Sequence, residues 1–301
     1  MQTAERAGPG SDGPRPTAGG GPDLAPGAGR ARGTLLAGRR PGRSSGRWRA
    51  LSPSSWLPAL VALGALSLAW QLVAIHNPTV LPTDTAVLSE LWHSPGLFWH
   101  DTLVTLQEVA VGLTSSFALA FGLAVAMSYL KVIERAVMPL AVVLNVTPVV
   151  ALAPGLVVAF GFDLVPRYIV TAVIVFFPFL VNSLVGLRSA DPEALEVLRT
   201  LHASQFETLV RLRLPSSLPY LFAAARVCLP LSVVGAVVAE MSSSGDAGGL
   251  GSLIETASAY SDLARIYAAI LVLAALGLAL TLAVVVLERR ALSWRAPASG
   301  S

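Results

Sequence analysis

The stretch DPEALEVLRTLHASQFETLVRLRLP, residues 191–215, mixes charged and apolar residues between two long apolar runs. It opens with a favourable helix start. Asp191 can accept hydrogen bonds from the free N–H groups of a first turn, and Pro192 fits the first helical position. Leucines then recur at helical spacing, with charged residues between them. We therefore expect a first amphipathic helix over residues 191–201.

A second helix start follows within the same segment. Ser204 and Glu207 have the S-x-x-E spacing of a capping box, in which each side chain bonds the backbone N–H of the other residue. Pro215 is expected to end this helix, because the residue before a proline disfavours the helical conformation. The spacing therefore predicts a second short helix over 204–214, joined to the first near His202.

Two locations are compatible with such a pair of helices. They can lie on the inner leaflet of a membrane, as amphipathic helices with basic residues do. They can also dock into a groove of a protein partner. The acidic side chains favour docking, because anionic lipid would repel them. These side chains are Asp191, Glu193, Glu196 and Glu207.

The rest of the chain has the composition of a membrane protein. Of its 301 residues, 54% are hydrophobic and 13% are charged, whereas a soluble domain carries about 25% charged residues. Apolar runs long enough to cross a bilayer lie near residues 56–76, 104–129, 138–161, 165–187, 217–241 and 264–287. The sequence therefore predicts an all-α polytopic membrane protein with six transmembrane helices.

The two ends of the chain differ from this central part. Residues 1–50 are rich in glycine, proline, alanine, serine and arginine, and they hold few large apolar side chains. Such a segment cannot bury enough apolar surface to offset the entropy cost of ordering it. We therefore expect 1–50 to be a disordered tail, 51–295 to form the transmembrane domain and 296–301 to be a short C-terminal tail.

The orientation of the spans follows from the basic residues. Arginine and lysine concentrate in every second connection, beginning with the N-terminal tail and including the 191–215 segment. Because cytoplasmic loops carry an excess of basic residues, both termini and this segment are expected on the cytoplasmic side. The same asymmetry accounts for the net charge of +3 without a nucleic-acid partner.

The 191–215 segment resembles the EAA motif of ABC importer permeases, E-A-A-x3-G-x9-I-x-L-P. The motif positions fall on Glu196, Val197, Leu198, His202, Leu212, Leu214 and Pro215. Larger apolar residues replace the two alanines. His202 stands where the family has a glycine that eases the turn between two coupling helices, and histidine tolerates a positive φ less readily than glycine.

Other phrases are similar to those of the nitrate/sulfonate/taurine-type permeases. They are TPVVALAP (147–154), FGFD (160–163), FFPFLVNSLVGLRS (176–189), and Ala239-Glu240 followed by the glycine turn 248–251. The resemblance covers roughly residues 80 to 295. It implies the MetI-like fold of type I ABC importer permeases.

The resemblance implies a permease subunit that forms half of the pathway for a small solute such as nitrate, a sulfonate or taurine. Its partners would be a second permease copy, cytoplasmic ABC ATPase subunits and an extracytoplasmic solute-binding protein, in a bacterial inner membrane. Lys131 is the only lysine, and no G-x-x-x-x-G-K-[ST] phosphate loop surrounds it. ATP and magnesium would therefore bind the partner ATPase, and no cofactor is expected on this chain.

Three residues are candidates for the pathway or its gate. Pro148 and Pro154 interrupt an apolar run, where they leave backbone carbonyls for a water-lined cavity or simply kink a packed helix. Glu240 is an ionisable group in an apolar run, and it can serve in a gate or contact the binding protein. Glu108 is expected at the outer headgroups, since the run from Val109 can span almost unaided.

The remaining chemistry is sparse. The four histidines give no metal site, and no Ser-His-Asp or Cys-His arrangement is recognisable. We therefore expect no catalysis by this chain. An ion-coupled secondary transporter is the alternative function, but it calls for a buried ionisable relay and often internal repeats, which the sequence does not reveal.

Overall fold

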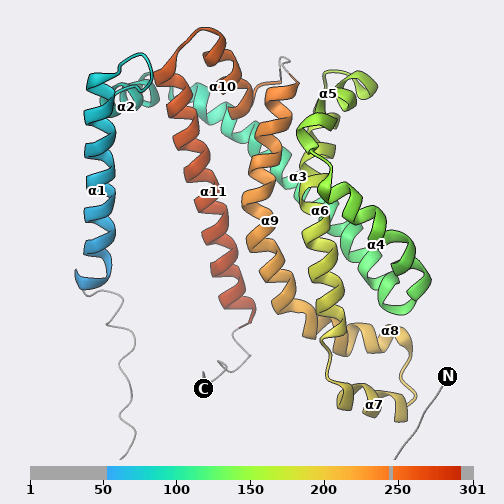
Figure 1. Ribbon diagram of the computed structural model, residues 1–301. Coiled ribbons are helices and arrows are strands. Elements are labelled where there is room, and N and C mark those ends of the chain that lie inside the picture. The colour runs from blue at the N-terminus through green and yellow to red at the C-terminus, as the bar shows by residue number, and fades with distance from the viewer. Residues whose placement is uncertain (1–52, 244–246, 293–301) are drawn as a thin grey trace, which may run out of the picture. The chain divides into compact units, whose positions relative to one another are not determined.

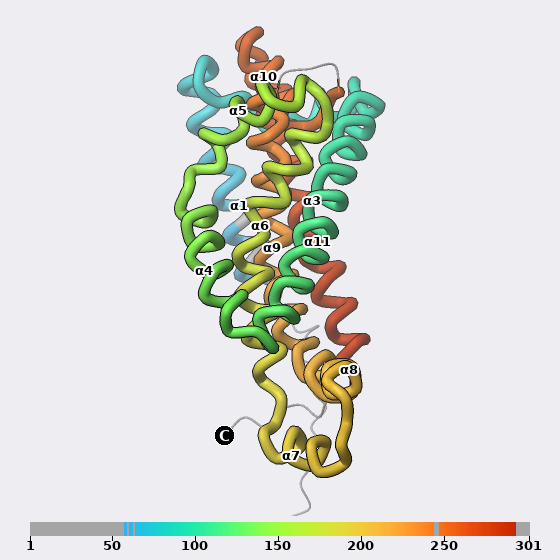
Figure 2. The backbone as a smooth tube through the Cα atoms, turned by 90° about the vertical axis from the view of Figure 1, so that its right-hand side faces the viewer, coloured from blue at the N-terminus to red at the C-terminus, as the bar shows by residue number. Residues whose placement is uncertain are grey.

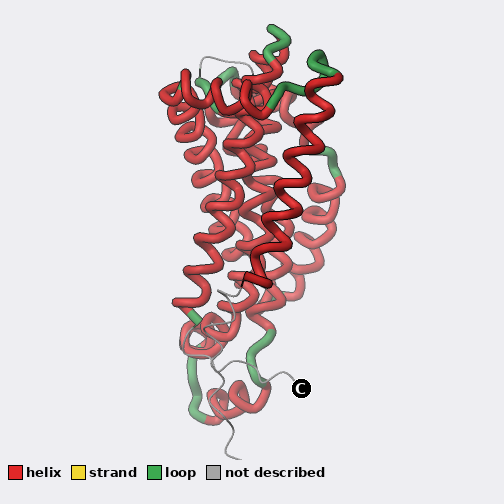
Figure 3. The backbone as a smooth tube through the Cα atoms, turned by 90° about the vertical axis from the view of Figure 1, so that its left-hand side faces the viewer, coloured by secondary structure: helices red, strands yellow, loops and turns green. Residues whose placement is uncertain are grey.

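The computed structural model describes residues 53–243 and 247–292, and every regular element in these ranges is helical (Figure 3). The tails expected at 1–50 and 296–301 lie outside the described residues. The elements are α1 (Pro53–His76), α2 (Asp84–His93), α3 (Pro95–Tyr129), α4 (Lys131–Val146), α5 (Val149–Phe160), α6 (Leu164–Arg188), α7 (Pro192–Thr200), α8 (Gln205–Thr208), the π-helical turn η2 (Leu209–Arg213), α9 (Leu214–Ser242), α10 (Leu250–Ala259) and α11 (Leu263–Ala291).

Within the described residues, four helical runs are long and apolar enough to cross a membrane: α3, α6, α8 to α9, and α11. The bent pair of α4 and α5 makes a fifth if it is counted as one span. The apolar part of α1, Leu60–His76, is shorter than the other runs. An all-helical polytopic membrane protein is thus confirmed, and the sixth span stays a prediction.

The apolar run expected as one span over 138–161 is two helices. α4 and α5 meet at an angle of 99°. The break falls before Pro148, because a proline pushes the preceding residue out of the helical region, and Thr147 is extended with φ −68° and ψ 126°. Pro148 itself precedes the first residue of α5, while Pro154 lies inside that helix.

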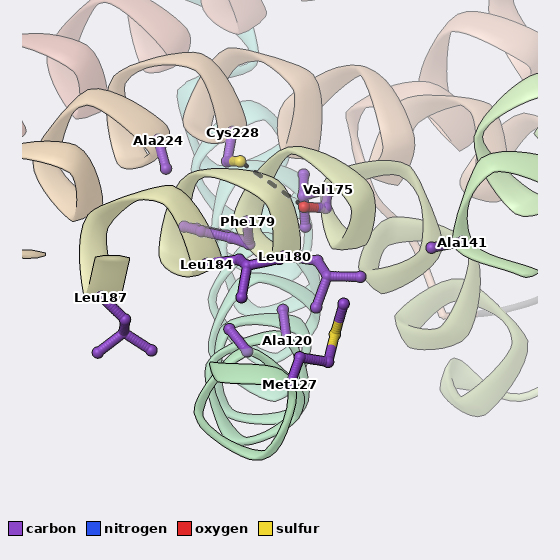
Figure 4. Packing of buried hydrophobic residues seen from close by; sticks show 11 residues of the cluster. Ala120, Met127, Ala141, Val175, Phe179, Leu180, Leu184, Leu187, Ala224 and Cys228 are labelled. Carbon is purple, nitrogen blue, oxygen red and sulfur yellow. Dashed lines mark hydrogen bonds between the residues drawn. The ribbon is translucent and has the colours of Figure 1, made fainter. Parts of the chain in front are cut away.

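Helix α6 packs against both α3 and α9 and forms the centre of the bundle. Figure 4 shows Phe179, Leu180 and Leu184 of α6 in the same apolar cluster as Met127 of α3. Close approach of α3 and α6 depends on Gly112, since a Cβ there would lie 2.6 Å from the Thr171 side chain. Small residues at such contacts allow membrane helices to pack closely.

The short helices lie at the two ends of this bundle. Helices α7 and α8 lie together at one end, and α2, α5 and α10 lie at the other (Figures 1 and 2). Helix α1 meets the rest through Trp70, whose ring lies edge-on to Tyr267 with centroids 5.1 Å apart. The indole N–H of Trp70 also donates to the carbonyl oxygen of Pro82 at 3.0 Å. We call the two ends the α7 end and the α10 end.

Candidate functional site

The 191–215 segment begins as its sequence predicts. Helix α7 starts at Pro192, and the Asp191 carboxylate accepts a hydrogen bond from the backbone N–H of Glu193 at 3.0 Å. An aspartate cap and a proline in the first turn both stabilise the helix start without help from the rest of the protein. The first predicted helix is therefore confirmed, to within a residue at each end.

His202, which forms the turn between the two short helices, has a left-handed backbone. Its φ is +55°. The N–H of Ala203 donates to the carbonyl oxygen of Leu198, and the N–H of His202 donates to that of Arg199, both at 3.0 Å. These two bonds are the Schellman arrangement that ends helices at a left-handed residue, usually glycine. The turn between the helices is thus closed in the usual way, with a histidine in a strained position.

We expect His202→Gly to stabilise the 191–215 segment, because a non-glycine residue costs roughly 1–2 kcal/mol in the left-handed region. Hydrogen exchange of the Arg199 to Ala203 amides in the purified chain should slow. His202→Val is the matched control and should have the opposite effect on exchange, since a β-branched residue tolerates a positive φ least. Faster exchange in His202→Gly than in the native chain would refute this account of the turn.

The second helix start is also confirmed. The backbone N–H of Ser204 donates to Glu207 Oε2 at 2.9 Å, and the N–H of Glu207 donates to Ser204 Oγ at 3.2 Å. Both bonds of the capping box are therefore present. Glu207 also pairs with Arg211 at 3.6 Å. This end of the turn is held by local side-chain contacts.

The expectation that Pro215 ends the second helix is wrong. Helix α8 passes through η2 into α9, and the residue before the proline, Leu214, is helical with φ −64° and ψ −49°. A wide π-helical turn just before the proline accommodates a ring that cannot donate an N–H. Pro215 therefore lies in the first turn of α9 and links the 191–215 segment to a long apolar helix without a break.

The surface of the segment is partly apolar. The side chains of Val197, Leu201, Phe206 and Val210 are 57%, 70%, 73% and 43% exposed. Among the other motif positions, Glu196 is exposed, whereas Leu198, Leu212 and Leu214 are partly buried. Val197 and Leu201 lie outside the candidate membrane spans, and exposed apolar side chains in such a place are typical of a protein contact surface.

The α10 end contains a buried polar cluster that the sequence did not reveal. The side chain of Arg167 is 1% exposed and that of Glu108 is 0% exposed, and their charged atoms lie 3.1 Å apart. The guanidinium also donates to the carbonyl oxygens of Ser243 and Gly248, at 2.8 Å each. A buried cation is tolerated only when it is paired and hydrogen-bonded in this way.

Glu240 holds the start of α10 within the same cluster. It is fully buried, its carboxyl group lies beside that of Glu108, and it accepts a hydrogen bond from Thr105 Oγ1 at 2.7 Å. Its other oxygen accepts from the N–H of Gly251, at 2.5 Å. A Cβ on Gly249 would lie 2.4 Å from the Glu240 carboxyl carbon, and its φ is +111°, so only glycine fits there.

The burial of these two carboxyl groups corrects the expectation for Glu108 and removes one of the two roles expected for Glu240. Glu108 is not exposed to headgroups, because its side chain is 0% exposed within the packed bundle and pairs with Arg167 from α6. The buried carboxyl of Glu240 offers no surface to a binding protein. A role for Pro148, Pro154 or Glu240 in the pathway or its gate stays a prediction. The available signal for this cluster was the opposite charge of Glu108 and Arg167 in two separate apolar runs.

Comparison with known proteins agrees with the motif and the fold. Residues 118–293 match the family model described as binding-protein-dependent transport system inner membrane component. The formylaminopyrimidine transport permease protein ThiX of Halalkalibacterium halodurans is 32% identical over 82% of this chain and 97% of its own length. The riboflavin transport system permease protein RibX of Chloroflexus aurantiacus is 33% identical over 84% of this chain and 97% of its own length.

A relative named for sulfonates also matches, in line with the phrases quoted from the sequence. The putative aliphatic sulfonates transport permease protein SsuC of Bacillus subtilis is 28% identical over 80% of this chain and 88% of its own length. The range matched by the family model, 118–293, includes the 191–215 segment. The chain therefore belongs to the binding-protein-dependent inner membrane component family, the permease subunits of ABC transporters.

Proposed function

We propose that this permease forms half of the transmembrane pathway of an ATP-driven importer and couples to a separate ABC ATPase through its 191–215 segment. The observation that carries the proposal is the direct helical link from this segment into α9. Both short helices have capped starts, and their exposed side chains include Glu196, Val197 and Phe206. A partner bound to this surface can move α9 directly, because no flexible hinge separates the surface from that helix.

Motion of α9 reaches the rest of the bundle through packing. Helix α9 contacts α6 along its length, and α6 contacts α3. At the α10 end, Arg167 and Glu240 tie α6, α9 and the start of α10 together. Packed helices move as rigid bodies rather than deforming continuously. ATP-driven closure of the ATPase subunits would therefore alternate access between the two faces by tilting the bundle.

The rest of the assembly follows from the family. A second permease copy completes the pathway, a solute-binding protein delivers a small solute such as nitrate, a sulfonate or taurine, and ATP and magnesium bind the ATPase. Helix α1 supplies the sixth span, and both termini and the 191–215 segment face the cytoplasm of a bacterial cell. Residues 51–295 form the transmembrane domain, flanked by the 1–50 and 296–301 tails.

Ion-coupled secondary transport is the second candidate, and one observation favours it. The cluster of Glu108, Arg167 and Glu240 is a buried ionisable group of the kind that proton-coupled transporters use. Its arginine, however, is engaged by two backbone carbonyls and its Glu240 by a backbone N–H, which suits a structural clamp. Family membership also favours the ATP-driven importer.

We expect Glu196→Ala to weaken ATPase association at least about tenfold, since loss of one charged contact in an interface costs 1.4 kcal/mol or more. The tagged permease is co-expressed with the ABC ATPase encoded beside it, and the retained ATPase is measured. Glu193→Ala removes the same charge from the same exposed helix face outside the motif, and it should retain the ATPase. Equal retention by Glu196→Ala and the native permease would contradict the proposal.

A further inference from the structure

A polar cavity of ≈ 270 Å³ lies at the α7 end, between the 191–215 segment and the end of α3. Its walls include Arg199 of α7, Arg213 of η2, and Ser128 and Tyr129 of α3. None of the described residues that line it is acidic. The cavity therefore presents two positive charges and no negative one to whatever enters it.

Both arginines keep donors available. Within the described part of the chain, the ion pairs of this region join Arg188 to Glu134 and Arg211 to Glu207, and none includes Arg199 or Arg213. Arg213 is held in place by its stacking over the Tyr129 ring, with its Cζ atom 4.9 Å from the ring centroid, and by one bond from Nη1 to Ser128 Oγ at 3.3 Å. Its other N–H groups remain free to bind a ligand.

The hydroxyl groups of Tyr129 and Thr208 are not free to donate to a ligand, because both donate to backbone carbonyl oxygens. Tyr129 Oη donates to the carbonyl oxygen of Gln205 at 2.9 Å, and Thr208 Oγ1 donates to that of Ser204 at 3.0 Å. Both fix the walls of the cavity. The charged donors of the lining are therefore two guanidinium groups, whose planar N–H pairs match the oxygens of a phosphate.

The location of the cavity along the bundle indicates where such a ligand could come from. The apolar helix α3 ends at Tyr129, and the long run that contains α9 begins at Gln205, so the cavity lies at the level where candidate spans end. Figure 2 shows α7 and α8 at this end of the bundle. An anionic phospholipid headgroup and a soluble phosphate can both reach this level.

We propose that this cavity binds a phosphate group between Arg199 and Arg213. The bound phosphate would join α7 and η2 through charge, next to the end of α3. It would thereby fasten the 191–215 segment to the bundle by a contact that depends on the ligand. None of Glu196, Val197 and Phe206 lines this cavity.

The test uses the full-length chain, purified in detergent or placed in nanodiscs, with two probes. Native mass spectrometry measures retention of phosphatidylglycerol against phosphatidylcholine, and calorimetry measures binding of inorganic phosphate. Arg199→Gln combined with Arg213→Gln should weaken binding at least about tenfold, because two charge-assisted contacts are lost. Arg211→Gln removes one charge from the same segment, from a side chain 72% exposed and paired with Glu207, and it should bind as the native chain does.

Each outcome decides the proposal. Selective retention of phosphatidylglycerol, lost in the double variant, supports the site with a lipid headgroup as its ligand. Binding of inorganic phosphate, lost in the same variant, supports it with a soluble ligand. The single variant Arg199→Gln, which changes an exposed side chain, serves if the double variant does not fold. Binding of neither probe to the native chain, or equal weakening by Arg211→Gln, overturns the proposal.

Discussion

Arg167→Leu will destabilise the protein by about 3–5 kcal/mol, the usual cost of removing one partner from a buried ion pair. The substitution leaves the Glu108 carboxyl group, which is 0% exposed, in the bundle without its cation. It also removes the donors that reach the carbonyl oxygens of Ser243 and Gly248. The start of α10 loses its attachment to α6 in the same step.

Reversible unfolding in mixed micelles measures this loss. Arg265→Leu is the control, because Arg265 pairs with Glu90 at 2.8 Å but is 36% exposed, and exposed pairs contribute about 0–1 kcal/mol. Arg167→Leu combined with Glu108→Leu should recover part of the stability, because it removes the unpaired buried carboxyl group but leaves the carbonyl oxygens of Ser243 and Gly248 without their donors. Equal destabilisation by Arg167→Leu and Arg265→Leu would show that the cluster is not a clamp.

Val197→Asp combined with Phe206→Asp will lower the affinity for the ATPase by about a hundredfold or more, as loss of apolar anchors does in protein interfaces. These side chains are 57% and 73% exposed, so the substitutions disturb no packed core. A charge on each short helix would instead be buried on docking, without a partner. The free permease should unfold as the native chain does.

Titration of purified ATPase onto the permease in nanodiscs measures this affinity. Thr200→Asp is the matched control, since it adds a charge to an exposed position of α7 without removing an apolar side chain. It should bind the ATPase within a few-fold of the native permease. If the double variant binds as tightly as Thr200→Asp, the exposed apolar side chains do not form the coupling surface.

Local interactions explain what the sequence could predict. The Asp191 cap and the Ser204–Glu207 capping box join residues two or three apart, so their spacing is enough to locate both helix starts. The turn at His202 was placed for the same reason. Its left-handed backbone was not predictable, because histidine has no strong preference for a positive φ and the Schellman bonds impose it.

Interactions between distant parts of the chain explain what was missed. Glu108 and Arg167 lie on α3 and α6, and neither position alone signals the ion pair. Pro215 was expected to stop a helix, but the π-helical turn before it and the packing of α9 outweigh its local preference. The proline before α5 did act locally, and there the break in the predicted span is explained by the residue itself.

The most direct test of the proposed function is uptake of solute into proteoliposomes that contain the permease and the ATPase encoded beside it. The solute-binding protein encoded beside the permease is added together with the solute that co-purifies with it. We predict uptake only with ATP and the binding protein present, and none with an ATPase variant that binds but does not hydrolyse ATP. Uptake driven by an ion gradient in vesicles that lack the ATPase would contradict the account.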